Sequence, residues 1–416
     1  MAEKTDIIVI GAGASGIMAA IGAAEVGARV TLLERNSAIG RKINATGNGR
    51  CNFTNEDGNN LGHYYAGNKE FVKGVLESFP VERILEFFES IGVVPCLEDE
   101  GKYFPLCGQA SYVSEALERK LASLGVTVEK GVKVEEVKAD NNGVTVRAEG
   151  KTYYGKGVVI SAGGNAAPDT GSDGNGYGLA RALGHRIVEP MPIIVQMKTK
   201  GGFYKSLSGL RVKANVTLEA DGKEVRTEYG DLMFFDYGIS GPPVFHISCE
   251  YAYIASRAKQ IFCLLDIVPQ INEAELERLL TCQSKVMSNS VEEMLAGIIN
   301  KKLIRLVLES AGVAGNKPAG VLLPKEIKQI ASALKGIRVV PTGTKGWENA
   351  QATAGGVTLE QVDPRTLRSR LNGKVAFCGE ILDVQGDCGG YNLTWAWASG
   401  HLCGVRLAEA VCEGRK

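Results

Sequence analysis

The chain has 416 residues, of which 44% are hydrophobic and 23% are charged, a balance typical of a globular protein with two or three domains. Lysine and arginine together number 47, as do aspartate and glutamate, so the formal net charge is zero. A broad nucleic-acid-binding surface needs an excess of basic residues. We therefore predict no nucleic-acid partner.

Cysteine and histidine spacing gives no sign of a metal site. The ten cysteines are all at least nine residues apart, which predicts neither a zinc ribbon nor a dithiol redox pair. The four histidines, at positions 63, 185, 246 and 401, also lack a ligand spacing. We expect reduced, mostly buried thiols, as in a cytoplasmic protein, and no bound metal.

Residues 7–24 form an uncharged run of 18 residues, long enough to consider a membrane helix. Four glycines interrupt the run, and acidic residues accompany the only lysine that precedes it. A signal peptide needs a basic leading segment. We therefore predict neither a signal peptide nor a membrane anchor.

The same run is better explained as the start of a nucleotide-binding fold. Residues 5–10 are typical of a buried parallel strand, residues 17–28 of a helix, and residues 29–34 of a second strand ending at Glu34. Between the first strand and the helix lies GAGASG, in which Gly11 permits the tight turn, Gly13 lets the backbone approach a pyrophosphate, and Gly16 allows close packing. The helix N-terminus attracts the anion. Glu34 stands where an acid accepts hydrogen bonds from ribose hydroxyls.

Two later segments favour FAD over NAD. Residues 155–164 form another strand that ends in glycines, and residues 375–404 contain a third strand, the acids Glu380 and Asp383, and a Gly389-Gly390 pair that precedes an apolar helix. The nucleotide-binding fold is thus entered at residue 5 and completed near residue 410. A nicotinamide domain is normally one contiguous block, whereas FAD suits this arrangement. The helix dipole would face the pyrimidine edge of the flavin, where negative charge builds on reduction.

Several distinctive segments resemble the BaiN-like family of NAD(P)/FAD-dependent oxidoreductases, also described as the aminoacetone oxidase family. The matching segments, which span the chain in order, are GAGASG, GRKINATGNGRCNFTN, GKYFPLCGQASYV, YGISGPPVF, ATAGGVTLEQVDPRTLRS and FCGEILDVQGDCGGYNLTWAWASG. The chain departs from many relatives at Phe235-Asp236 and at Lys102. Both departures lie outside the nucleotide motifs, so they bear on the substrate and not on FAD.

The resemblance implies that the loop from Arg41 to Asn52 lies along a non-covalent FAD. Its glycines can expose backbone N–H groups, its basic residues can offset phosphate charge, and its asparagines can bond the flavin edge. We expect Cys51 to be a packing residue and not a redox group. The predicted FAD-contacting residues are Gly11, Gly13, Ala14, Ser15, Gly16, Glu34, Arg35, Arg41, Lys42, Thr46, Gly47, Asn48, Gly49, Arg50, Cys51, Asn52, Val134, Gly163, Gly379, Glu380, Asp383, Gly389, Gly390, Tyr391, Asn392 and Leu393.

The predicted fold class is α/β, with a Rossmann-type FAD-binding domain of residues 1–190 and 345–416. After residue 190 the pattern alternates with period 2 across an Asp221-Gly222 turn, which indicates a hairpin. We therefore predict an inserted antiparallel β-barrel or sandwich of residues 191–270 and 336–344. Helical patterns between them predict a nested helical insertion of residues 271–335. The resemblance implies the same plan of three domains.

The resemblance also implies three alternatives for function. The first is reduction by NAD(P)H of an activated C=C bond in 3-oxo-Δ4,6 steroid or bile-acid intermediates. The second is oxidation of an amine such as aminoacetone by O2, and the third is a flavoprotein that binds RNA or another partner. No second G-x-G-x-x-G occurs in the sequence, so NAD(P)H would dock transiently at the flavin. We expect a small-molecule substrate and no membrane partner, and assign neither a catalytic residue nor an oligomeric state.

Overall fold

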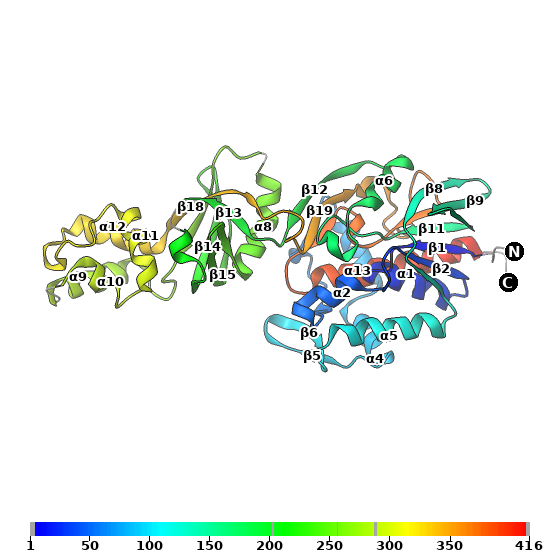
Figure 1. Cartoon of the computed structure of the whole chain (residues 1–416), viewed down its shortest axis with the longest axis horizontal. Coiled ribbons are helices and arrows are strands. Elements are labelled where there is room, and N and C mark those ends of the chain that lie inside the picture. The colour runs from blue at the N-terminus through cyan, green and yellow to red at the C-terminus, as the bar shows by residue number, and fades with distance from the viewer. Residues whose placement is uncertain (1–4, 202–203, 256, 287–288, 413–416) are drawn as a thin grey trace. The chain divides into compact units, whose positions relative to one another are not determined.

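The computed structural model describes residues 5–201, 204–255, 257–286 and 289–412. The chain forms two compact units, one of residues 1–192 with 350–416 and the other of residues 193–349. Each unit is described separately below, and Figure 1 shows the elements of both. Within the described residues, no helix is both long and apolar enough to span a membrane.

A five-stranded parallel sheet forms the centre of the first unit (Figure 1). Its strands, in spatial order, are β20 (Val375–Phe377), β11 (Gly157–Ile160), β1 (Ile7–Ile10), β2 (Val30–Glu34) and β7 (Thr127–Lys130). The central strands are rich in β-branched residues, as expected for a sheet covered on both faces. Ile10 pairs with both Leu33 and Ile160, so the carboxyl ends of β1, β2 and β11 meet at one edge.

Two helices rich in small residues pack closely against each other in the same unit. They are α1 (Ala14–Glu25) and α13 (Tyr391–Cys412). A Cβ added at Gly400 would lie 2.3 Å from the Ser15 carbonyl oxygen, and one at Gly404 would lie 2.0 Å from the Ala19 carbonyl oxygen. The glycines of α13 are therefore required for this approach, which brings the last helix of the chain beside the first.

The other elements of the first unit surround this sheet and helix pair. The helices are α2 (Arg41–Ala45), α3 (Lys69–Ser78), α4 (Val81–Ser90), α5 (Ala110–Ser123) and α6 (Asn175–Ala182). The strands are β3 (Thr54–Asn55), β4 (Tyr64–Ala66), β5 (Pro95–Leu97), β6 (Lys102–Pro105), β8 (Val134–Asp140), β9 (Gly143–Ala148), β10 (Lys151–Gly155), β12 (Ile187–Ile193), β19 (Ala352–Val357) and β21 (Val384–Gly386).

A closed antiparallel barrel forms the sheet of the second unit. Asp221 and Gly222 both have positive φ and join β14 to β15, as the hairpin prediction requires. The barrel core is apolar and includes Val216, Leu232 and Cys263. In spatial order its strands are β13 (Met197–Lys200), β16 (Gly238–Ser240), β15 (Lys223–Phe235), β14 (Arg211–Ala220), β17 (Ile261–Asp266) and β18 (Ile337–Thr344).

The helices of the second unit are α7 (Tyr204–Leu207), α8 (Pro242–Ile254), α9 (Glu273–Val286), α10 (Val291–Leu295), α11 (Lys301–Ala311) and α12 (Pro324–Lys335). The helical pattern of residues 290–312 is split into α10 and α11, because the Asn300 side chain accepts a hydrogen bond from the Lys302 N–H and starts a new helix. The predicted fold class, a Rossmann-type domain with an inserted antiparallel β structure, is confirmed. The predicted boundaries of the three domains stay predictions.

Candidate cofactor-binding site

A pocket in the first unit opens at the edge where β1, β2 and β11 end. Ligands of open parallel sheets bind at this edge, beyond the carboxyl ends of the strands. The lining residues are Ile10, Gly11, Ala12, Gly13, Ala14, Ser15, Leu33, Glu34, Arg35, Asn36, Arg41, Lys42, Ile43, Thr46, Val132, Lys133, Val134, Ser161, Ala162, Gly163, Thr170, Gly171, Ser172, Asn175, Gln351, Ala352, Glu380, Asn392, Leu393 and Ala396.

The three glycines of the first turn have different structural tasks. Gly11 has φ +99°, and a Cβ there would lie 2.7 Å from the Ser161 carbonyl oxygen. A Cβ at Gly16 would lie 1.8 Å from the Gly11 carbonyl oxygen, so Gly16 is needed for packing and does not line the pocket. Gly13 caps α1, lines the pocket, and has no atom within 4 Å of an added Cβ. A ligand can therefore approach the backbone at Gly13.

The Glu34 carboxylate is held at the pocket wall by backbone N–H groups. Its Oε2 accepts a hydrogen bond from the Ala12 N–H at 2.8 Å, and its Oε1 accepts from both the backbone N–H and the side-chain amide of Asn36 at 2.8 Å. The residue is buried. These bonds fix the orientation of the carboxylate, and a carboxylate oxygen has further lone pairs for a ribose hydroxyl.

Four basic residues line the pocket, namely Arg35, Arg41, Lys42 and Lys133, and the first three have the following partners. Lys42 Nζ lies 2.8 Å from Glu380 Oε2, and Glu380 Oε1 accepts from the Thr353 N–H at 2.7 Å. Arg35 pairs with Asp173 at 2.6 Å, and Arg41 donates to the Asn36 side-chain oxygen at 3.1 Å. Positive charge is thus present at the pocket, as a bound pyrophosphate would require.

Most of the glycine-rich loop lies outside the pocket. Thr46 lines it, whereas residues 47–52 do not. Gly47 and Asn48 have φ near +57° and +55°, so the backbone is left-handed within the 3₁₀ helix η1 (Thr46–Gly49). Arg50 forms an ion pair with Glu98, and its guanidinium carbon lies 4.3 Å from the centre of the Phe104 ring. Arg50 is thus paired with Glu98, and its predicted role in offsetting phosphate charge stays a prediction.

Cys51 is fully buried in this loop. Burial raises the pKa of its thiol to about 12, against a smaller opposing effect from a hydrogen bond with Thr46. A thiol with such a pKa is protonated at neutral pH and is a poor nucleophile. The geometry agrees with a packing role for Cys51.

Asn52 retains an unused acceptor beside the next glycine pair. Its Oδ1 is buried and has no hydrogen-bond partner among the described residues. A Cβ added at Gly390 would lie 3.1 Å from this oxygen and 2.7 Å from the Thr54 carbonyl oxygen. Buried acceptors without partners are costly, and a ligand N–H would satisfy this one. The arrangement fits a polar, hydrogen-bonding cofactor.

Some of the predicted residues in and just before the start of α13 line the pocket, and others do not. A Cβ at Gly379 would lie 2.2 Å from Ser15 Oγ, so Gly379 serves close packing. Burial raises the pKa of Asp383, which does not line the pocket. Asn392 lines it, but its Oδ1 accepts from the Gly386 N–H at 2.9 Å and its Nδ2 donates to the Gly386 oxygen at 2.8 Å. The Asn392 amide thus bonds the Gly386 backbone at both its polar atoms, and its predicted contact with a flavin stays a prediction.

The structure thus brings together about half of the predicted residues. Those in the pocket are Gly11, Gly13, Ala14, Ser15, Glu34, Arg35, Arg41, Lys42, Thr46, Val134, Gly163, Glu380, Asn392 and Leu393. Those outside its lining are Gly16, Gly47, Asn48, Gly49, Arg50, Cys51, Asn52, Gly379, Asp383, Gly389, Gly390 and Tyr391. Lining residues that the sequence analysis missed include Asn36, Lys133, Ser161, Ala162 and Gln351. Ser161 and Ala162 directly precede the predicted Gly163, which was the available signal.

Curated relatives match nearly the whole chain. The 3-dehydro-bile acid delta(4,6)-reductase of Clostridium scindens is 39% identical over 405 residues, which cover 96% of this chain and 98% of that protein. The ribosomal RNA dihydrouridine synthase of Escherichia coli is 30% identical over 98% of this chain and 99% of its own length.

Solved structures share the fold at low sequence identity. The 3-ketosteroid delta1-dehydrogenase of Sterolibacterium denitrificans, in complex with 1,4-androstadiene-3,17-dione, matches with a TM-score of 0.52 and 13% identity, covering 98% of this chain and all of that one (100%). The 3-ketosteroid-delta4-(5alpha)-dehydrogenase of Rhodococcus jostii RHA1 matches with a TM-score of 0.51 and 16% identity, covering 99% of this chain and 98% of that one.

The family model described as the HI0933-like protein Rossmann domain matches residues 5–406. This match covers the parallel sheet, the pocket, the whole of α1 and most of α13. Together with the 39% identity to the reductase, it confirms the family resemblance seen in the sequence. The chain belongs to the HI0933-like Rossmann family.

Proposed function

We propose that this protein is an FAD-dependent oxidoreductase that reduces a C=C bond conjugated to a carbonyl, in a 3-oxo-Δ4,6 steroid or bile-acid intermediate, with NAD(P)H as donor. The observation that carries the proposal is the 39% identity, over 96% of the chain, to a 3-dehydro-bile acid delta(4,6)-reductase. The pocket at the edge of the parallel sheet supports the proposal, as the place where the cofactor would bind.

The second relative supports the same kind of reaction. Dihydrouridine is uridine with its C5=C6 bond reduced, and in uridine that bond is conjugated to a ring carbonyl. The names of both relatives therefore describe products or substrates of reduction at an activated C=C bond. We take this bond type, more than any one molecule, as the chemistry of the site.

The residues of the pocket fit FAD. The open backbone at Gly13 and the N-terminus of α1 would bind the pyrophosphate, and Glu34 would accept hydrogen bonds from the adenosine ribose. Lys42 would offset phosphate charge. FAD bound here would supply hydride transfer to and from its isoalloxazine ring.

The N-terminus of α13 has a separate task in this proposal. Its first N–H groups have no acceptor within the helix, and Leu393 and Ala396 lie on the pocket wall. A helix N-terminus stabilises negative charge without a basic side chain. The backbone of residues 391–393 would thereby hold charge that develops on reduction, while apolar Leu393 and Ile43 exclude water.

An anaerobic flavin-bleaching assay tests the proposal. We expect yellow protein that releases free FAD on heat denaturation, and bleaching by NADH or NADPH. The bleached protein should be reoxidised by a 3-oxo-Δ4,6 steroid and not by the matching saturated 3-oxo steroid. Bleaching only by amines, with reoxidation by O2, would favour an aminoacetone-type oxidase, and dihydrouridine formed in ribosomal RNA would favour the RNA reaction.

A further inference from the structure

A chain of hydrogen bonds in the first unit leads from a buried threonine to a lysine at the pocket wall. Thr353 Oγ1 accepts from the backbone N–H groups of Asn165 and Ala166 at 2.9 and 3.1 Å. The Thr353 N–H donates to Glu380 Oε1 at 2.7 Å. The other oxygen of that carboxylate, Oε2, accepts from Lys42 Nζ at 2.8 Å. Segments far apart in the sequence are thereby joined to Thr353, either directly or through Glu380.

The segments that Thr353 joins lie at the pocket, although Thr353 itself does not. Lys42 and Glu380 line the pocket, as do Gly163 and Ala352, which are close in sequence to the other bonded groups. Thr353 is not part of the lining, and it is fully buried. Thr353 can therefore affect a ligand of the pocket only through the residues that it holds.

The loop after β11 approaches Thr353 very closely. A Cβ added at Gly164 would lie 2.3 Å from Thr353 Oγ1 and 3.2 Å from Glu380 Oε1. The backbone thus comes as near to both groups as a residue without a side chain allows. The hydroxyl supplies the acceptor for the buried bond from Ala166, and an N–H group left there without an acceptor would be costly.

Thr353 belongs to the strand on which the chain returns from the second unit. That unit ends at residue 349, and β19 begins at Ala352 (Figure 1). The partner of β19 in its sheet is β12, on which the chain leaves the first unit. The bonds of Thr353 therefore fix the returning strand against the loop after β11 and against Glu380.

Lys42 is the end of this chain that bears on a phosphate. Its ammonium is a compact charge on a flexible stem, so its place depends on the groups that bind it. Glu380 is its carboxylate partner, and the bond from the Thr353 N–H orients that carboxylate. The place of the Lys42 charge at the pocket wall thus depends on Thr353.

We propose that Thr353 is a positioning residue: its hydroxyl holds the loop after β11, and its N–H orients Glu380, which places the Lys42 ammonium for a phosphate of the cofactor. This inference rests on the proposed FAD site. Its consequence is that removing a hydroxyl outside the pocket lowers FAD affinity, and that the loss depends on Lys42. A merely structural role for Thr353 would lower FAD affinity by the same factor with or without Lys42.

A double-mutant cycle on FAD affinity tests this dependence, with the apoproteins titrated by flavin fluorescence. Thr353→Val keeps the branched shape and removes the acceptor, so we expect about tenfold weaker binding. Thr353→Ser keeps the hydroxyl and should bind FAD within about threefold of the wild type. In a Lys42→Ala protein the loss caused by Thr353→Val should shrink to less than about threefold, because the lysine that Thr353 positions is absent.

Thr358→Val is the matched control. Thr358 follows the last residue of β19 and is also buried and outside the pocket lining. Its hydroxyl accepts from Arg186 Nη2 at 3.4 Å, so its hydrogen bond leads away from Glu380. We expect the same FAD affinity in Thr358→Val as in the wild type.

Each outcome decides the question. Circular dichroism first confirms that every variant is folded, and Thr353→Ala repeats the cycle if Thr353→Val does not fold. An equal loss with and without Lys42, a loss as large in Thr353→Ser as in Thr353→Val, or failure of both Thr353→Val and Thr353→Ala to fold overturns the positioning role and leaves the FAD site intact. A wild-type protein that binds no FAD overturns the proposed function and this inference with it.

Discussion

Two glycine-containing segments of the first unit look alike in sequence and differ in the structure. Residues 11–16 follow the end of β1, and five of the six, all except Gly16, line the pocket. Residues 46–52 carry more polar side chains than residues 11–16, yet Thr46 alone among them lines the pocket. The first segment forms the site, whereas the second mainly forms a turn that supports it.

The difference comes from what fixes each backbone. In residues 11–16, strand β1 and helix α1 fix the two ends of the turn, so the backbone between them is constrained and each glycine has one geometric role. In the second, the path is set by left-handed residues such as Asn48 and by contacts of Arg50 with Glu98. Composition indicated a polar loop, but it could not indicate which side faces the ligand.

The largest expected effects separate folding from binding within the first segment. Gly16→Val should prevent folding, with a loss of more than about 4 kcal/mol, because its Cβ would lie 1.8 Å from a backbone oxygen. Gly13→Val should fold, because an added Cβ there meets no atom within 4 Å, yet it should not retain FAD. Thermal unfolding and FAD titration of both variants measure this. Normal FAD binding by Gly13→Val would contradict the site.

A second comparison uses one basic residue that lines the pocket, Lys42, and one that does not, Arg50. Lys42→Ala should weaken FAD binding by about 1–3 kcal/mol, the usual cost of losing a charge-assisted hydrogen-bonding group. Arg50→Ala should leave FAD affinity unchanged, because Arg50 lies outside the lining and its charge is paired with Glu98. Isothermal titration of FAD into both apoproteins checks this. Equal losses in the two variants would show that the loop reaches the cofactor after all.

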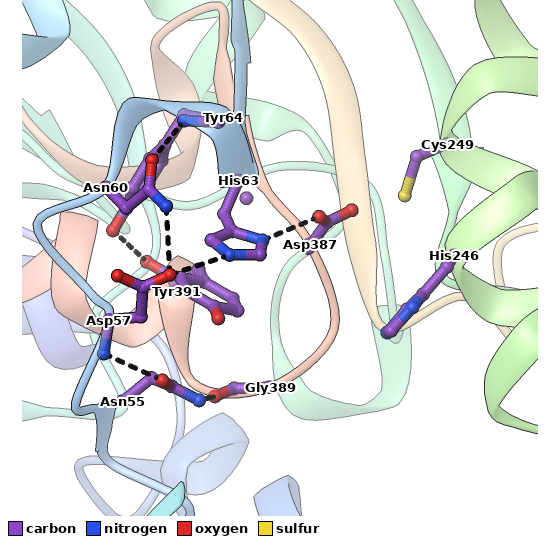
Figure 2. Close-up of polar contacts among 12 residues, drawn as sticks. Asn55, Asp57, Asn60, His63, Tyr64, His246, Cys249, Asp387, Gly389 and Tyr391 are labelled. Carbon is purple, nitrogen blue, oxygen red and sulfur yellow. Dashed lines mark hydrogen bonds and ion pairs between the residues drawn. The ribbon is translucent and has the colours of Figure 1, made fainter. Parts of the chain in front are cut away.

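Particular residues show how far the sequence alone could lead. Gly11, Gly13 and Glu34 were predictable, because a βαβ unit places a glycine turn and an acid at fixed distances along the chain. Asn392 was predicted and lines the pocket, but its two hydrogen bonds to the Gly386 backbone were not predictable, because a local sequence pattern does not show them. The contact of 3.1 Å between His63 and Asp387 (Figure 2) joins residues 324 positions apart, so spacing could not reveal it.

The closed barrel was predictable only as a class. Alternation with period 2 and the Asp221-Gly222 turn indicated antiparallel strands, but they left barrel and sandwich open. Closure depends on β13 pairing with both β16 and β18, which are far apart in the sequence. Such non-local pairings are set by the packing of the whole unit and not by local propensity.

Two glycines of the loop should differ in their effect on stability. A Cβ at Gly47 would lie 2.8 Å from the Asn52 backbone nitrogen, whereas one at Gly49 would meet no atom within 4 Å. Both have positive φ, so Gly49→Ala should cost about 1 kcal/mol and Gly47→Ala about 1–3 kcal/mol. Urea unfolding gives both values. If Gly49→Ala were the more damaging variant, the path of the loop described above would be wrong.

The smallest effect concerns the thiol of the loop. Because burial raises the pKa of Cys51 to about 12, its thiol should stay protonated and resist iodoacetamide at about pH 8, while the exposed Cys107 is alkylated. Mass spectrometry of briefly treated protein measures this, with urea-unfolded protein as the control in which both react. The raised pKa of Cys51 also determines how this thiol changes the free energy of unfolding with pH. Above the ordinary thiol pKa of 9.0 the unfolded chain releases this proton while the folded chain keeps it, so Cys51 lowers stability as the pH rises. Alkylation of Cys51 as fast as that of Cys107 would instead place the thiol at an open, ligand-facing surface of the loop.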